Sequence, residues 1–170
     1  YSESLQRSVE SWYYLFNPYE SSEFSNEEKK WLDKLERIGF GEFAPLLIAI
    51  YRQEKTSAKR IQLIKTIERL RFSQILVGFY YRSYLFDAPE FDNLKTSAQY
   101  LDGELKIELI IKKYEEDILK LMGHQDFKEN MRREFKNSGF YKWRGIRYFL
   151  FEYEQHLRES SKSSHHKIFW

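Results

Sequence analysis

The sequence contains no cysteine, which excludes disulfide scaffolds, thiolate metal sites and thiol nucleophiles. It also has no apolar run close to the roughly 20 residues that a membrane-spanning helix needs. Its first residues do not have the character of a secretory signal. We therefore expect a soluble, cytoplasmic protein that does not associate with a membrane.

A period-two alternation of apolar and polar residues, the pattern of a half-buried strand, is also missing over any useful length. The three prolines and seven glycines lie mostly at breaks between segments in which apolar residues recur every three or four positions. With 170 residues, the chain is long enough for one well-packed core and short for two. These features predict an all-α protein with a single helical-bundle domain of about seven to eight helices over residues 1–159, and a polar linker or tail over residues 160–170.

The breaks divide the chain into predicted helices. Ser25 and Glu28 have the spacing of a capping box, and Gly39 is a natural C-terminal cap. The helix that has Pro45 in its first turn is apolar nearly all round, so we expect it to be central. Helices are expected over residues 4–16, 25–39, 45–51, 57–84, 92–100, 104–123, 126–137 and 141–157, the fourth being the longest.

Residues 141–157 predict an amphipathic helix with an aromatic inner face. Large apolar side chains recur at offsets of three, four, seven and eleven, namely Ile146, Phe149, Leu150, Tyr153 and Leu157. Arg147, Glu154 and Arg158 stand on the other side, and Glu154 is spaced to pair with Arg158 across one turn. Such a helix is unstable alone, so we expect the rest of the chain to supply a groove that buries the apolar face.

Residue types that are common in catalytic and metal sites are few. The histidines are His124, His156, His165 and His166. No two of them have the i, i+4 spacing of helical metal ligands, and no acidic cluster surrounds them, so we expect no metal site. Gly39 and Gly41 lack the preceding strand and the lysine of a phosphate-binding loop. We expect no cofactor in this chain.

One pair of residues offers a catalytic alternative. Arg158 and His165 have the spacing of the Arg–His motif in helical ribonucleases of the HEPN type, which resemble this chain in being small, all-α and without metal. In that interpretation Arg158 holds the scissile phosphate and His165 transfers a proton.

A cluster of positive charge is the second candidate site. The basic cluster consists of Lys128, Arg132, Arg133, Lys136, Lys142, Arg144 and Arg147, with Glu129 and Glu134 interspersed. The net charge of the whole chain is only +2, which argues against a nucleic-acid footprint over the entire surface. Two interpretations stay open, namely contacts with DNA phosphates and an ordinary solvated helix face.

The residues 146–157, Ile-Arg-Tyr-Phe-Leu-Phe-Glu-Tyr-Glu-Gln-His-Leu, resemble the RYxLxxYExxL helix of GmrSD-type proteins. These are modification-dependent restriction endonucleases and their bacterial relatives. The segments 31–51 and 65–82 are similar to the helical middle of the same proteins, in the same order. In that family, a ParB-like N-terminal domain with an Asp-Gly-Gln-Gln-Arg motif hydrolyses nucleotide, and a C-terminal His-Asn-His-type nuclease with a His-Ile-Xaa-Pro motif cuts DNA.

Neither of these motifs occurs in the sequence, so no catalytic residue is carried over from the family. The resemblance implies a non-catalytic helical connecting module of a restriction or anti-phage endonuclease. Its expected partners are the flanking nucleotide-binding and nuclease domains, together with DNA if the basic cluster binds phosphates. Because the chain opens on Tyr1 and ends at Trp170 directly after Lys-Ile-Phe, we also expect it to be part of a longer protein. A plain helical protein–protein interaction module is the third alternative.

Overall fold

The computed structural model describes residues 2–80, 92–123, 128–129, 132–133, 136, 143 and 145–161. In these ranges the protein is all-α, with no strand, as predicted. The α-helices are α1 (Ser2–Phe16), α2 (Asn26–Ile38), α3 (Ala44–Gln53), α4 (Ser57–Tyr80), α5 (Asn93–Leu101), α6 (Ile107–Met122) and α8 (Ile146–Ser161). Two short 3-10 helices, η1 (Pro18–Glu20) and η2 (Gly41–Phe43), precede α2 and α3.

Seven of the predicted helices are observed, with some boundaries shifted, and most of the helix predicted over residues 126–137 lies outside the described residues. Helix α8 begins at Ile146, later than the predicted start at residue 141. The longest described helix is α4, with 24 residues, and the predicted end at residue 84 lies outside the described residues. Helix α6 begins three residues later than predicted, because Gly103 adopts a positive φ of 75° and the amides of Glu104 and Leu105 both donate to the Gln99 carbonyl. Helix α8 continues to Ser161, so the first two residues of the expected tail are helical.

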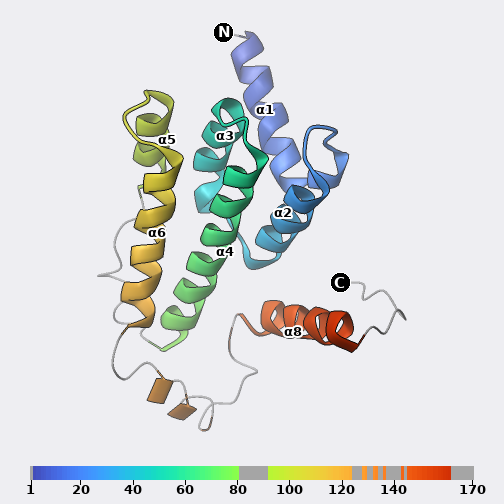
Figure 1. The fold of residues 1–170 in the computed structure, drawn as a ribbon, viewed down its shortest axis with the longest axis vertical. Helices are drawn as coiled ribbons and strands as arrows, with labels where there is room; N and C mark the ends of the chain where they lie inside the picture. The colour runs from blue at the N-terminus through green and yellow to red at the C-terminus, as the bar shows by residue number, and fades with distance from the viewer. Residues whose placement is uncertain are drawn as a thin grey trace.

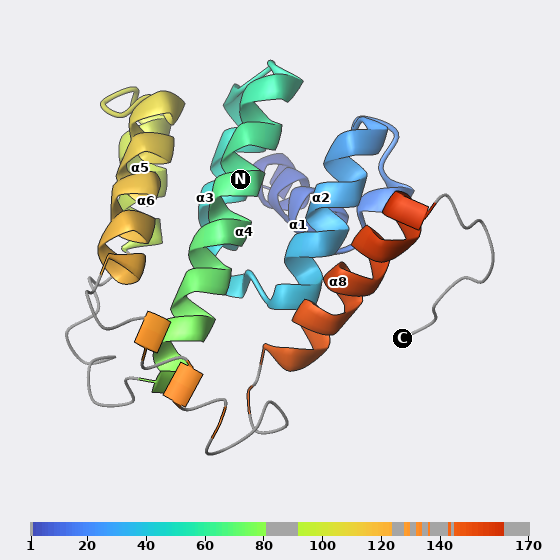
Figure 2. The ribbon, with the colours of Figure 1, turned by 60° about the horizontal axis from the view of Figure 1, so that its bottom comes forward.

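Six of the helices form two layers. Helices α2, α4 and α6 lie side by side in one layer, and α1, α3 and α5 lie behind them in the other (Figure 2). Helix α8 lies along the edge beside α2, at the opposite side of the molecule from α5 and α6 (Figures 1 and 2). Within the described ranges, none of the helices combines the length and the apolar content that crossing a membrane requires.

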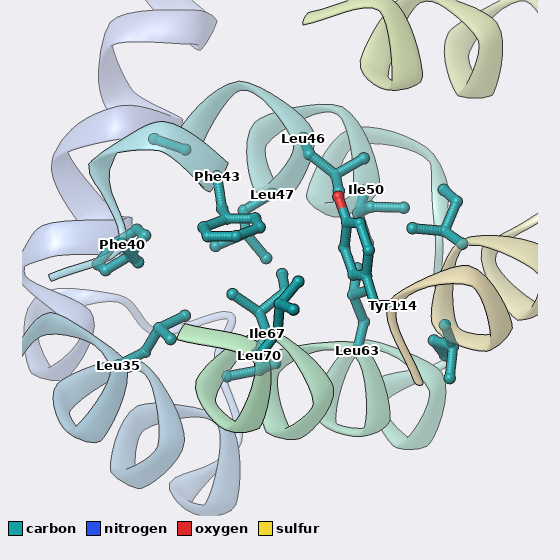
Figure 3. Close-up of a cluster of buried hydrophobic side chains, with 14 of the residues drawn as sticks. Leu35, Phe40, Phe43, Leu46, Leu47, Ile50, Leu63, Ile67, Leu70 and Tyr114 are labelled. Atoms are coloured by element: carbon teal, nitrogen blue, oxygen red, sulfur yellow. The ribbon is translucent and has the colours of Figure 1, made fainter. Parts of the chain in front are cut away.

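The core lies between the two layers. Helix α3 is central, as predicted, and its fully buried side chains Leu46, Leu47 and Ile50 face Leu63 and Ile67 of α4 (Figure 3). Phe43 and Tyr114 close the space between the layers with an edge-to-face ring contact, with centroids 5.9 Å apart. Burying each such large apolar side chain stabilises the fold by roughly 1.5–3 kcal/mol, so this interface is the main source of stability.

The predicted capping box at the start of α2 is present and is extended by an ion pair. The Ser25 hydroxyl accepts from the Glu28 amide, and the Glu28 carboxylate accepts from the Ser25 amide. Glu28 is fully buried, and Arg60 Nε of α4 donates to its second oxygen at 2.6 Å. Burial opposes ionisation of Glu28, but the hydrogen bonds from Arg60 and Ser25 outweigh it and lower its pKa. The pair therefore ties α2 to α4 as a charged contact.

Candidate functional site

The large apolar side chains of α8 face the solvent. We call four of these residues the outer stripe: Phe149, Leu150, Tyr153 and Leu157. Their side chains are 39%, 53%, 53% and 43% exposed, respectively. Phe149 and Tyr153 lie with their rings nearly parallel and their centroids 6.1 Å apart. The predicted aromatic inner face was therefore wrong for these four residues, whereas Ile146 is half-buried at the start of the helix. The predicted pair of Glu154 and Arg158 is confirmed, at 3.2 Å.

The opposite side of α8 contacts the core through a charged seam. The seam consists of Lys34 and Arg37 of α2, Glu68 of α4, and Tyr148 and Glu152 of α8. The Glu152 carboxylate accepts from Arg37 Nη2 at 3.0 Å and forms an ion pair with Lys34 Nζ at 3.1 Å. The Tyr148 hydroxyl donates to Glu68, and Lys34 lies 3.8 Å from the same carboxylate. Ion pairs and one phenol thus hold this helix in place.

The environment of the seam keeps Tyr148 protonated and Arg37 charged. Burial, and then the hydrogen bond to Glu68, raise the pKa of Tyr148, so this hydroxyl stays protonated and acts as a donor. Burial opposes the charge of Arg37, but its bonds to Glu152 and Asp33 raise its pKa, so the guanidinium stays charged. The Arg37 guanidinium also lies over the Phe151 ring, 4.3 Å from its centroid.

The first turn of α8 is fixed by an aromatic contact that the sequence did not reveal. Trp143 is buried and packs against Leu76 and Phe72 at the end of α4, with the rings of Trp143 and Phe72 6.0 Å apart. The Tyr148 ring lies 5.9 Å from the same Phe72. Phe72 therefore anchors both Trp143, three residues before α8, and Tyr148 in the first turn of the helix.

The charge pattern explains which face of α8 points inward. Lys30, Lys34 and Arg37 form a basic row on α2, at offsets of four and seven. Glu152 and Glu159 face that row in the reverse direction, with Lys30 Nζ 3.3 Å from Glu159 and Arg37 beside Glu152, so the two helices run antiparallel. Lys30 and Arg37 are seven positions apart, as are Glu152 and Glu159. This equal spacing of opposite charges is the sequence signal that could have identified the seam residues.

The members of the basic cluster that the structure describes are exposed. Lys128, Arg132, Arg133 and Lys136 are helical and exposed, as is Arg147 on α8. Lys142 and Arg144 lie outside the described residues, as does most of the helix predicted over residues 126–137. Exposure leaves both interpretations of the cluster open, because phosphate contacts and a solvated face each require it.

The two residues of the ribonuclease alternative are not both described. Arg158 lies on α8, where its Nε donates to Glu154 at 3.2 Å, whereas His165 lies outside the described residues. His156 is exposed on the same helix. Among the described residues, no three histidine, aspartate or glutamate side chains gather closely enough to hold a metal ion.

The chain's relationship to known proteins was tested in three ways. No protein-family profile, no curated protein and no solved structure matches it. Its function has to be inferred from its own residues, from their geometry and from the resemblance of its helical segments.

Proposed function

We propose that this chain is the helical connecting module of a GmrSD-type restriction or anti-phage endonuclease and is not catalytic by itself. In this proposal the helices connect a nucleotide-binding domain to a nuclease domain and couple the nucleotide state of the first to the second. Helix α8 supplies the contact surface. The exposed members of the basic cluster add contacts with DNA phosphates.

The outer stripe is the observation that carries this proposal. Four large apolar side chains lie along one helix, with the polar Glu154 and Arg158 beside them. A contiguous exposed apolar surface with a polar rim is typical of a protein interaction site. The stripe also lies on residues 146–157, the segment that resembles the RYxLxxYExxL helix of GmrSD-type proteins. A helix that turns its apolar side away from its own core is well suited to contact a second domain.

Two measurements test the proposal. Sequencing the reading frame on both sides of the codons for Tyr1 and Trp170 is expected to find an Asp-Gly-Gln-Gln-Arg motif upstream and a His-Ile-Xaa-Pro motif downstream. The purified 170-residue chain is expected neither to cleave DNA nor to hydrolyse nucleotide. A start codon just before Tyr1 with a stop codon just after Trp170, or either activity in the purified chain, would overturn it.

The outer stripe equally supports a helical interaction module without nuclease partners. That alternative predicts binding to a protein partner that is insensitive to salt, with no affinity for nucleic acid. The ribonuclease alternative predicts RNA cleavage that His165→Ala abolishes. If the purified chain does not cleave RNA, the ribonuclease alternative is excluded.

A further inference from the structure

Helix α8 is held to the core in a different way from helix α4. Helix α4 inserts Leu63, Ile64, Ile67 and Leu70 into the core, each with no exposed surface. Among the described side chains of α8, only Tyr148 is buried to a comparable degree. Separating α8 from the core therefore exposes far less apolar surface than separating α4 would, and it costs correspondingly less free energy.

Water reaches the contacts that replace apolar burial at α8. The side chains of Lys34, Arg37 and Glu152 are 21%, 23% and 24% exposed. Ion pairs between side chains that keep some contact with water contribute modestly to stability, and dissolved salt weakens them, although less than it weakens fully exposed pairs. The docking of α8 thus depends on ionic strength to a degree that the leucine and isoleucine core does not.

The core keeps its charges paired when α8 leaves. Arg37 also pairs with Asp33 on its own helix, and Lys34 lies 3.8 Å from Glu68 of α4. Removing Glu152 therefore leaves each of these two cations with one acidic partner on α2 or α4. A core that retains paired charges avoids the large penalty of an uncompensated buried ion.

We propose that α8 is a releasable helix, in equilibrium between a docked and an undocked state. In this proposal the ion pairs of Glu152 stabilise the docked state. The Glu152 carboxylate is the one group of the seam that joins α8 to both cations of α2. In the undocked state, Tyr148 and Phe151 leave Phe72 and Arg37 and become available beside the outer stripe. This equilibrium is a property of the chain itself and does not depend on the proposed connecting function.

Hydrogen exchange of the purified chain, resolved by residue, tests this proposal. A single helix of this length is marginal in water, so its amides exchange whenever it undocks. Raising sodium chloride to about 1 M, where the screening length is about 3 Å, is expected to speed exchange in α8. The expected increase is about tenfold, because two partly exposed pairs together contribute roughly one factor of ten. The central amides of α4 are expected to show no such acceleration.

A matched pair of substitutions tests whether the salt dependence of α8 exchange comes from Glu152. Glu152→Gln is expected to accelerate α8 exchange about tenfold at low salt and to remove most of its salt dependence. Glu154→Gln makes the same chemical change on the same helix, but Glu154 pairs with Arg158 within α8, so this control is expected to change exchange little. The proposal is overturned if Glu152→Gln and Glu154→Gln behave alike. It is also overturned if α8 of the unaltered chain exchanges together with α4 at every salt concentration, which decides the matter even if Glu152→Gln does not fold.

Discussion

Gly145 shows how closely the backbone before α8 approaches the side chains around it. A Cβ atom at this position would lie 2.5 and 2.7 Å from the Trp143 indole and 3.0 Å from Cγ2 of Ile75. Trp143 is buried against Leu76 and Phe72, so displacing its indole would disturb these contacts. Position 145 therefore needs a glycine, because a Cβ atom does not fit without displacing its neighbours.

Gly145→Ala is expected to destabilise the protein by about 1–3 kcal/mol, the usual cost of inserting a methyl group into a packed site. Displacement of the indole is also expected to change the near-ultraviolet circular dichroism. Gly41→Ala is the control, because a Cβ atom at Gly41 meets nothing within 4 Å. Urea denaturation of both variants measures the difference. Equal stability of the two variants would show that Trp143 does not pack against Gly145 in solution.

The sequence predicted contacts between residues a few positions apart, but it did not predict contacts between residues far apart in the chain. The capping box of Ser25 and Glu28 and the pair of Glu154 and Arg158 span three and four positions, so their spacing alone identifies them. The partnership of Arg60 with Glu28 joins residues 32 positions apart, which no spacing rule reveals. The same applies to Gly145, whose constraint comes partly from Ile75 of another helix.

Helix α8 shows that apolar content alone does not determine which side of a helix packs. The existence and period of the helix were predicted, but its orientation was not. The surface that receives it, on α2 and α4, presents Lys34, Arg37 and Glu68. Burying the outer stripe against these charges would desolvate them without partners, which costs more than leaving apolar groups exposed. The complementary face, with Glu152, packs instead.

Leu150→Ala is expected to lower the free energy of unfolding by about 0.5–1 kcal/mol at most, because half of this side chain is already in water. Ile67→Ala, on the fully buried face of α4, is expected to cost about 2–5 kcal/mol. Urea denaturation midpoints of the two variants give the comparison. A cost at Leu150 that approaches the cost at Ile67 would mean that the outer stripe is buried in the isolated chain.

At the scale of the whole molecule, the absence of strand patterns and the helical spacing of apolar residues were sufficient to predict the all-α class. They did not predict the two-layer arrangement or the position of α8 on its edge (Figure 2). Those depend on contacts between distant segments, such as Lys34 with Glu152, that periodicity does not encode. The basic cluster remains a prediction, since exposure of its described members does not identify a ligand.

If the basic cluster contacts DNA phosphates, Arg132→Glu with Arg133→Glu is expected to weaken binding equally for duplexes of different sequence. The slope of the logarithm of affinity against the logarithm of salt concentration is expected to fall by about two. Lys112→Glu with Lys113→Glu is the control, since these exposed lysines lie on α6 and carry the same charge change. Fluorescence anisotropy measures both variants. Similar affinity losses in the two double variants would show that binding depends on the overall charge of the chain and not on the basic cluster.

We propose that the outer stripe of α8 contacts another part of a longer protein. Hydroxyl-radical footprinting of the 170-residue chain and of the protein encoded by its whole reading frame tests this proposal. Strong labelling of Phe149 and Tyr153 is expected in the isolated chain and clear protection in the longer protein. Leu119, an exposed residue of α6, is expected to label equally in both. Equal labelling of Phe149 and Tyr153 in the two proteins would contradict the proposal.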